Sequence, residues 1–436
     1  MLTLLSALAL AVLDSTIANV ALPTISRDLG ISSAAAVWIV NAYNLTVVTM
    51  LLPLSAAAER VGFRRMFAIG LGVFVVGSLA SALAGSLAML IGARILQGIG
   101  AAMLMGMFGG FVRNIYPLSM MGRGISLNAM MVGVMSVLGP TIGAAILSVA
   151  SWPWIFAINI PIGLAAFFGV RMLPDVPAHP KPFDWSSALL SMLVLALFII
   201  GIDHLASAPL PAIGLVAASA VAGWYLVRRA LSQPAPLVPV DLLRIPALAF
   251  AVAASACSFA AQMSSFVALP FYFQQVLGRD HLTTGLLLGA WPVGAAIMAP
   301  LAGRLSDSYS PAVLSGIGAA AMGLGLAWLV VLPVDASLSW TVAAMLLAGV
   351  GFGFFQTPNN RAMLTAAPIH RSGAAGGLQA TTRVFGQSFG TALVAIGFTS
   401  SVQHGPTIAL GFGAMCAFAA LGVNCLRFRR MRERLP

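Results

Sequence analysis

Apolar residues are grouped along this chain in long runs, and short polar segments separate one run from the next. An α-helix needs about 20 predominantly apolar residues to cross a bilayer. We predict a membrane-spanning helix over each of fourteen runs: 2–25, 35–57, 66–85, 87–110, 125–149, 154–173, 185–204, 210–230, 246–277, 283–303, 311–332, 340–358, 373–399 and 406–426. Because this number is even, both ends of the chain are expected on one side of the membrane.

The composition agrees with this pattern. Hydrophobic residues make up 60% of the chain and charged residues only 8%, with a mean hydropathy of +0.99. Soluble domains carry about 25% charged residues. The sequence therefore predicts an all-α polytopic membrane protein, and in such a protein the net charge of +11 does not indicate nucleic-acid binding.

The basic residues are distributed unevenly between the two sets of loops. Of the 22 Lys and Arg residues, 18 lie in the C-terminal tail and in the loops that follow even-numbered runs, and only Arg27 and Arg279 lie in the opposite loops. Arg94 and Arg383 lie within runs. Because loops rich in Lys and Arg stay in the cytoplasm, we predict that both termini are cytoplasmic.

Two Pro-rich polar segments, Arg171–Trp185 and Ser232–Pro246, divide the chain. They predict a 6 + 2 + 6 arrangement, with an N-terminal six-helix bundle (1–174), a two-helix insert (175–235), and a C-terminal six-helix bundle with a basic tail (236–436). Weak similarity between glycine-rich stretches of the fourth and twelfth runs favours two pseudo-symmetric bundles. Such pairs suit alternating access around a site near the bilayer midplane.

A single carboxylate, that of Asp14, lies deep in an apolar run. A charge at this depth costs a few kcal/mol even on lenient scales, so an intramembrane acid indicates a functional site. Ala7, Ala11, Ala18 and Ala21 share its helix face and leave space for another helix or for water. We predict that Asp14 carries protons. The alternative is a polar contact that only holds two helices together.

Several motifs, in order, resemble those of the major facilitator superfamily, and more narrowly its fourteen-span drug:proton antiporters. They are LDSTIANVALPTI (13–25), WIVNAYNL (38–45), ARILQGIGAA (93–102), LGPTIGAAI (138–146), SWPWIFAINIPIG (151–163), LPFYFQQVLG (269–278) and RVFGQSFGTAL (383–393). The match covers essentially the whole chain and implies the major facilitator fold in a bacterial inner membrane.

The resemblance implies roles for three groups of residues. Arg94 is expected to act with Asp14 in proton coupling, the alternative being a structural role against backbone carbonyls. Gating is expected from a cytoplasmic loop and from a kink in the fifth run, the alternatives being membrane anchoring and plain packing. These gating residues are Glu59, Arg60, Gly62, Arg64, Arg65, Gly139, Pro140 and Gly143. The loop departs from the family pattern at Ser55, Glu59 and Phe63, and Pro153 replaces an arginine that is usual between Trp152 and Trp154.

Polar and aromatic side chains within the runs are candidates for a substrate pocket, which is usually apolar with a few polar groups. Any of them can instead face lipid or a neighbouring helix. The candidates are Asn19, Asn41, Tyr43, Gln97, Gln262, Phe266, Trp291, Phe355 and Gln356. Runs ten and thirteen hold no acid in their membrane-embedded parts, and this favours a monocationic or neutral substrate over a dication.

The sequence thus predicts a transporter that exports small lipophilic compounds in exchange for protons. The alternative is a proton-coupled exporter of one native metabolite. We expect no enzyme activity, cofactor or metal, because no nucleotide-binding loop, metal-ligand spacing or nucleophile–base arrangement is present. The expected partners are the substrate, protons and lipid, for a monomer without nucleic acid; no residue pattern supports a periplasmic adaptor.

Overall fold

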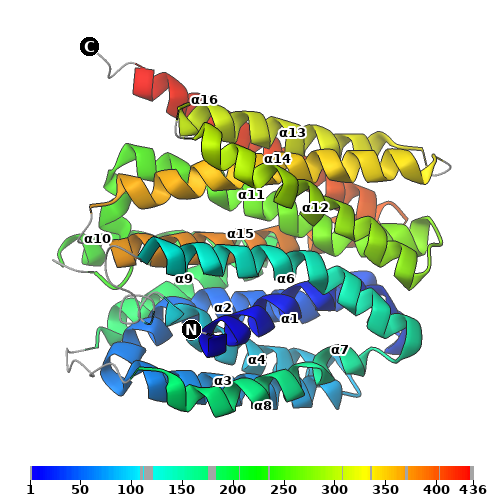
Figure 1. Ribbon diagram of the computed structural model, residues 1–436, viewed down its shortest axis with the longest axis horizontal. Helices are drawn as coiled ribbons and strands as arrows, with labels where there is room; N and C mark the ends of the chain where they lie inside the picture. Colours follow the sequence, from blue (N-terminus) through cyan, green and yellow to red (C-terminus); the bar gives the residue numbers. More distant parts are fainter. Residues whose placement is uncertain are drawn as a thin grey trace. The chain divides into compact units, whose positions relative to one another are not determined.

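Nearly every residue that the structure describes lies in a helix (Figure 1). The computed structural model describes residues 2–108, 111, 121–174, 183–205, 207–233, 236–306, 308–333, 336–368, 372–401 and 403–432. None of these residues lies in a β-strand. Contacts between residues divide the chain into two compact units. Unit 1 holds Met1–Gly201 and Ile213–Val238, and unit 2 holds Ile202–Ala212 and Pro239–Pro436.

Unit 1 contains the helices of the first eight predicted runs. They are α1 (Leu2–Asp28), α2 (Ser33–Val61), α3 (Phe63–Ala82), α4 (Leu87–Gly106), α6 (Met121–Val149), α7 (Pro153–Ala157), α8 (Asn159–Gly169), the 3₁₀ turn η2 (Val170–Met172), and most of α9 (Trp185–Asp203) and α10 (Pro209–Leu231). Helix α4 packs against both α2 and α3, and α6 packs along α1.

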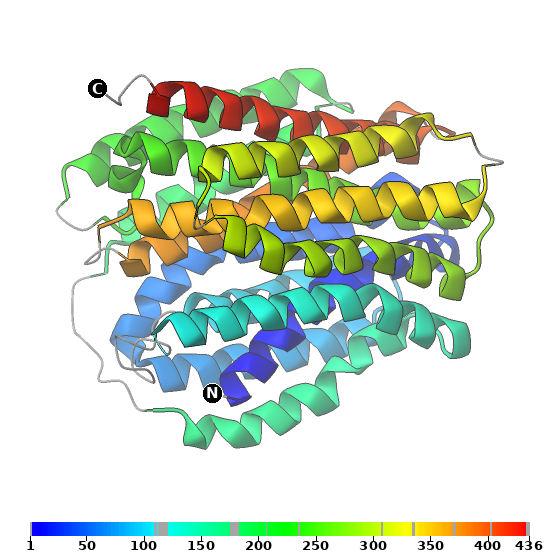
Figure 2. The same ribbon diagram turned by 45° about the horizontal axis from the view of Figure 1, so that its top comes forward.

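Unit 2 contains the helices of the last six runs. They are the 3₁₀ turn η3 (Val240–Arg244), α11 (Pro246–Phe271), the π-helical turn η4 (Tyr272–Val276), α12 (His281–Leu305), α13 (Pro311–Val331), α14 (Leu338–Ala366), α15 (Ser372–Ser400) and α16 (Gly405–Arg432). Helix α14 packs along both α12 and α13, and Figure 2 shows α13 and α14 side by side in yellow tones.

Twelve of the predicted runs coincide with helical segments that are long and apolar enough to cross a membrane. Runs 125–149 and 373–399 are helical as α6 and α15 but are not among these twelve. The run 154–173 is broken into α7, α8 and η2. Pro161 explains this break, because it has no N–H to donate to the carbonyl of Ala157, four residues earlier.

Glycines allow helices of each unit to approach closely. A Cβ on Gly100 of α4 would lie 2.5 Å from the backbone nitrogen of Phe74 in α3, and one on Gly294 of α12 would lie 2.6 Å from the carbonyl oxygen of Leu346 in α14. Real side chains do not approach backbone atoms so closely. Only glycine fits at these two crossings, as is common where helices pack in lipid.

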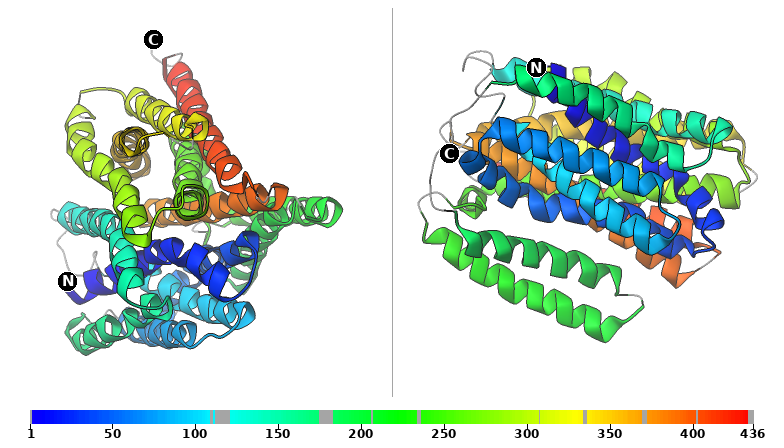
Figure 3. Two further views of the ribbon diagram at one scale, coloured as in Figure 1. Left: turned by 90° about the vertical axis from the view of Figure 1, so that its right-hand side faces the viewer. Right: turned by 90° about the horizontal axis from the view of Figure 1, so that it is seen from below.

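A polar clamp joins one end of α9 to the end of α10. Asp184 accepts hydrogen bonds from Arg229 Nη2 at 2.9 Å, from Gln233 Nε2 at 2.6 Å and from the backbone nitrogen of Ser187 at 3.1 Å. Farther along the pair, Ser219 Oγ donates to the carbonyl of Val194 at 2.8 Å. The two helices run side by side in Figure 3 (right, green). The clamp caps α9 and fixes its register on α10.

Substitution of Asp184 is expected to loosen this clamp. Asp184→Ala removes the cap and the ion pair, so amide hydrogen exchange in the first turn of α9 should become about fivefold faster at pH 7, the equivalent of about 1 kcal/mol. Asp184→Asn keeps a capping oxygen and should change exchange less. Equal exchange in wild type and Asp184→Ala would contradict the role of the clamp.

The clamp should withstand mild acid. Burial raises the pKa of Asp184, but hydrogen bonds from Ser187, Gln233 and Arg229 outweigh this effect and hold the pKa below its ordinary value of 3.8. A lowered pKa contributes stability that is complete above the ordinary value and is lost as the pH falls below it. Protection in the first turn of α9, corrected for intrinsic exchange, should therefore stay constant from about pH 8 to pH 5.

Candidate functional site

The carboxylate of Asp14 lies in the interior of unit 1, with no exposed surface, and accepts three hydrogen bonds. Arg94 Nη1 of α4 donates to Oδ2 at 2.5 Å, while Gln97 Nε2 of α4 and Asn159 Nδ2 of α8 donate to Oδ1 at 2.8 and 2.7 Å. Bonds to an ionised acceptor are shorter and stronger than neutral ones. The site therefore suits the ionised form of Asp14.

Arg94 is held from several sides and has no exposed surface. Its Nε donates to the carbonyl of Ile39 at 3.2 Å and its Nη1 also donates to Gln97 Oε1 at 2.6 Å. The guanidinium lies 4.2 Å from the ring centre of Tyr43 and 5.4 Å from that of Phe156, so both rings add cation–π attraction. The cation has a fixed place that does not depend on Asp14 alone.

Neutral groups extend the arrangement onto α2 and α3. Gln97 Nε2 also donates to Ser78 Oγ at 2.9 Å, and Ser78 Oγ donates to the carbonyl of Phe74 at 2.9 Å. The hydroxyl of Tyr43 donates to the carbonyl of Ala11, one turn before Asp14, at 3.1 Å. We call Asp14, Arg94, Gln97, Asn159, Ser78 and Tyr43 the Asp14 cluster. Five helices of unit 1 supply it.

Sequence reasoning missed two members of the cluster. Asn159 and Ser78 lie 145 and 64 positions after Asp14 in the chain, so spacing cannot bring them together. Asn159 begins NIPIG, one of the sequence landmarks, and its asparagine within an apolar run was the available signal. Nothing in the surroundings of Ser78 distinguishes it from other small helix residues. Gln97 was assigned to the substrate pocket, and in this conformation it bonds the ion pair.

The predicted kink in α6 lies against α1 beside Asp14. A Cβ on Gly139 would overlap the side chain of Thr16, and one on Gly143 would lie 2.8 Å from Cγ1 of Ile17. Pro140 is buried between these glycines. The motif thus lets α6 contact α1 within one turn of the carboxylate, while its gating role stays a prediction.

The predicted cytoplasmic gating loop is a tight connection between α2 and α3. Gly62 has φ +94°, a conformation that favours glycine, and its N–H donates to the carbonyl of Ala58 at 3.0 Å. Arg60 and Arg65 are exposed and Arg64 is half-buried. The side chain of Glu59 lies outside the described residues, so its predicted place in a charge network stays a prediction.

The predicted pocket residues fall into separate places. Asn19 and Asn41 of unit 1 are 2% and 0% exposed. In unit 2, Phe266 of α11 contacts Trp291 of α12, with ring centres 5.5 Å apart. Phe355 instead packs in a cluster with Ala254, Ala319 and Ala420. Gln262 and Gln356 are half-buried. Binding of substrate by any of these residues stays a prediction.

Comparison with known proteins settles the family. The model of the Major Facilitator Superfamily matches residues 4–391. The chain belongs to this superfamily. It is 44% identical to the uncharacterized transporter YebQ of Escherichia coli, over 99% of this chain and 96% of the relative. It is 30% identical to a multidrug resistance protein B homolog of Mycobacterium tuberculosis (92% and 76% covered) and 29% identical to the riboflavin transporter RibZ of Clostridioides difficile (91% and 87%).

Solved structures agree with the family at the level of the fold. A crystal structure of the peptide transporter POT in complex with sulfate superimposes with a TM-score of 0.74 at 18% sequence identity, over 99% of this chain and 94% of that one. The family and the relatives are transporters and not enzymes. The protein is therefore a multi-pass membrane transporter.

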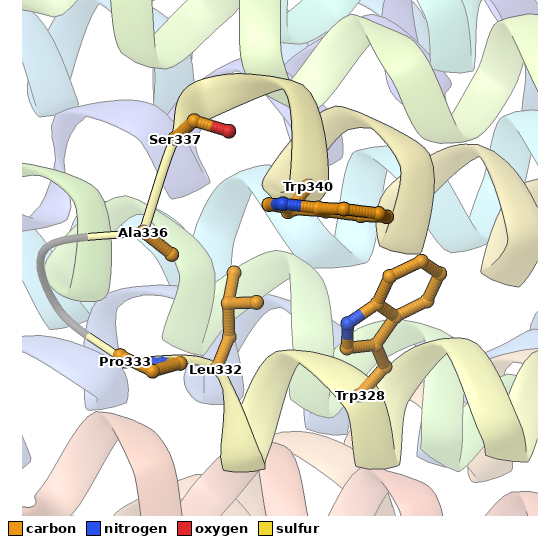
Figure 4. Close-up of a pocket in the computed structure, with 6 residues that line it drawn as sticks. All are labelled: Trp328, Leu332, Pro333, Ala336, Ser337 and Trp340. Atoms are coloured by element: carbon orange, nitrogen blue, oxygen red, sulfur yellow. The ribbon is translucent and has the colours of Figure 1, made fainter.

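A surface pocket of the protein lies where α13 ends and α14 begins (Figure 4). It is lined by Trp328, Leu332, Pro333, Ala336, Ser337 and Trp340. The two tryptophan rings lie 5.5 Å apart, and none of the described residues that line the pocket is charged. Tryptophans at the ends of spans anchor them in the membrane interface, so we assign the pocket to anchoring rather than to transport.

The Asp14 cluster brings one acid and one base together with neutral hydrogen-bonding groups. The described residues contain no group of three or more His, Cys, Asp or Glu that could ligate a metal ion. Two charges at full burial stabilise each other only as a pair, because removal of one leaves the other in a medium of low dielectric constant. Protonation of Asp14 would likewise leave the charge of Arg94 uncompensated in that medium.

Loss of one charge of the pair should destabilise the folded transporter. We expect Asp14→Asn to lower the free energy of unfolding by about 3–5 kcal/mol, because Arg94 keeps an uncompensated charge. The double variant Asp14→Asn/Arg94→Gln should recover about 2 kcal/mol of this loss. SDS titration in mixed micelles measures these values. Asp28→Asn, at the exposed end of α1, is the control and should change stability by less than about 0.5 kcal/mol. Equal losses in the single and double variants would contradict the coupling.

Proposed function

We propose that this transporter exports small lipophilic compounds from the cytoplasm in exchange for protons, with Asp14 as the proton-binding group. The observation that carries the proposal is the fully buried pair of Asp14 and Arg94, supported by amide donors on both carboxylate oxygens. An acid inside a membrane is costly and is kept for function.

Proton binding biases the conformation through Arg94. With Asp14 ionised, the pair is neutral as a whole and the described arrangement is stable. With Asp14 protonated, Arg94 is a lone buried cation, and a conformation in which it reaches water or another partner becomes favoured. A proton and a substrate that prefer different conformations are then coupled through one equilibrium.

The proposal includes the membrane arrangement. The chain forms a fourteen-span antiporter of 6 + 2 + 6 helices, with bundles 1–174 and 236–436 around the insert 175–235, in a bacterial inner membrane with both termini in the cytoplasm. The excess of basic residues in one set of loops supports this orientation. Substrate binds from the cytoplasm or the inner leaflet, and the proton enters from the opposite side. Gly139, Pro140 and Gly143 fit a gating role, because they set the contact of α6 with α1 beside Asp14.

Drug export has one competing proposal, export of a specific native metabolite. Similarity to a multidrug resistance protein B homolog supports the first, and similarity to a riboflavin transporter supports the second. Both proposals use the same proton chemistry and differ in the breadth of compounds transported. A panel of substrates therefore separates them.

Substrate-induced proton release tests the proposal directly. In inside-out vesicles with an imposed pH gradient, at least one compound from a panel of monocations, dications and neutral drugs should collapse the gradient in wild type and in Asp28→Asn. Asp14→Asn should show no response, because the carboxyl that binds the proton is absent. An equal response in Asp14→Asn would refute the assignment. A response to riboflavin alone would favour the narrow metabolite exporter.

Asn159 is expected to tune the same step as a positioning residue. Asn159→Ala removes a charge-assisted bond to ionised Asp14, which is worth about 1.5–3 kcal/mol. The pH midpoint of transport should therefore move upward by about one to two units, since 1.36 kcal/mol corresponds to one unit. Ser78→Ala is the matched control: Ser78 is equally buried, and it bonds Gln97 and the carbonyl of Phe74 rather than Asp14, so the midpoint should stay in place. The same shift in both variants would show a general packing effect.

A further inference from the structure

Four aromatic side chains of unit 2 form a cluster on three helices. Phe266 of α11 meets Trp291 of α12 edge to face, with centres 5.5 Å apart at 74°. Trp291 lies 6.2 Å from Phe352 of α14, and Phe352 lies 5.7 Å from Phe259 of α11 at 76°. All four side chains are at most 5% exposed. We call these residues the aromatic cluster.

The indole of Trp291 is the anomaly in this cluster. Trp291 is 1% exposed, and its Nε1 has no hydrogen-bond partner among the residues that the structure describes. The indole N–H can only donate, and a buried donor without an acceptor costs about 1–3 kcal/mol. Phenylalanine would supply the ring contacts without this cost. The N–H is therefore available to an acceptor that the described residues do not supply.

The polar groups that share the α11 stripe of the aromatic cluster are neutral. Gln262 follows Phe259 by three residues and precedes Phe266 by four, so it lies on the same stripe of α11. Ser255, one turn earlier on this stripe, is 1% exposed, and its hydroxyl has no partner in the described part of the chain. The stripe thus offers an amide and a hydroxyl beside the rings.

No carboxylate is available to hold a cation there. Within the described part of unit 2 the acidic side chains are Asp203, Asp241 and Asp280, which lie at the end of α9, in η3 and at the start of α12. The hydrogen of an indole N–H carries a partial positive charge, which repels a cation and attracts a carbonyl oxygen. The chemistry therefore disfavours a cation and favours a compound that presents a carbonyl oxygen to the indole N–H.

We propose that the aromatic cluster is a substrate subsite for a planar, uncharged aromatic compound whose ring carbonyl accepts a hydrogen bond from Trp291 Nε1. The proposal rests on the proposed export function and adds a substrate class to it. Planar rings pair with Phe and Trp in the same offset and edge-to-face geometries that the cluster already shows, each worth about 0.5–1.5 kcal/mol. The ring carbonyl of the compound accepts the hydrogen bond that the buried Trp291 Nε1 donates.

Helix α12 is built to open at this point. Pro292 directly follows Trp291 and leaves the carbonyl of Leu288 without its helical donor, which favours a bend. On the facing helix, Gly349 brings the α14 backbone against the carbonyl of Trp291, where a Cβ would overlap it. A change in the bend moves Trp291 relative to Phe266 and Phe352, and thereby admits a flat ring.

A matched pair of compounds tests the subsite. Fluorenone and fluorene share one planar tricyclic skeleton and differ by the ring carbonyl. Their binding to purified full-length protein in nanodiscs is measured by calorimetry, for wild type, Trp291→Phe and Trp328→Phe. Trp328 belongs to the surface pocket at the end of α13 and is the matched control.

Wild type and Trp328→Phe should bind fluorenone about tenfold more tightly than fluorene, which corresponds to about 1.4 kcal/mol. Trp291→Phe should lose this preference and bind fluorene within about twofold of wild type. Equal binding of the two compounds by wild type, or an unchanged preference in Trp291→Phe, would overturn the proposal.

One further variant and one condition of the assay keep the test decisive. If Trp291→Phe does not fold, benzothienylalanine at position 291 keeps the shape of the indole and removes only the N–H, and the same loss of preference is expected. Binding is measured without a proton gradient. Failure here therefore leaves proton exchange through Asp14 intact, and failure of the vesicle experiment leaves the fluorenone preference intact.

Discussion

The ion pair between Asp14 and Arg94 is the constraint on which unit 1 depends. Two charges with no exposed surface are tolerated only when they compensate each other and their remaining lone pairs and protons find partners. The cluster meets much of this condition with groups from five helices, which must all keep their register, while Nη2 of Arg94 has no hydrogen-bond partner among the described residues. Close contacts at Gly100 and Gly143 maintain that register without bulky side chains.

The neutral members of the cluster support the pair without changing its charge. Gln97 and Asn159 satisfy Oδ1 without adding charge, so the balance of the site is set by one acid and one base. A second basic residue would hold the acid ionised, and a second acid would leave Arg94 compensated after protonation. One of each makes the electrostatic cost of protonation large and therefore useful for a conformational change.

The sequence predicted the helices and the family, because span length follows from the bilayer itself and the motifs are specific. It also located Asp14 and Arg94, since charges within apolar runs are rare. It did not locate Asn159 or Ser78, because polar partners from distant helices leave no spacing signal. It named Phe355, and not Phe352, as a pocket candidate. The helix that carries both, α14, is packed on several sides, so periodicity alone does not tell which phenylalanine faces Trp291.

The two sites divide the chemistry of the proposed exchange between separate parts of the chain. The buried ion pair belongs to unit 1, at the Asp14 cluster, whereas the aromatic cluster of unit 2 offers rings, an indole donor and neutral polar groups. A neutral compound bound by such rings does not compete for the carboxylate. The proton and the substrate are then coupled through the equilibrium between conformations. Each of them shifts this equilibrium according to the difference in its affinity for the two conformations. Substrate range can therefore change at Trp291 and its neighbours while the proton step at Asp14 stays the same.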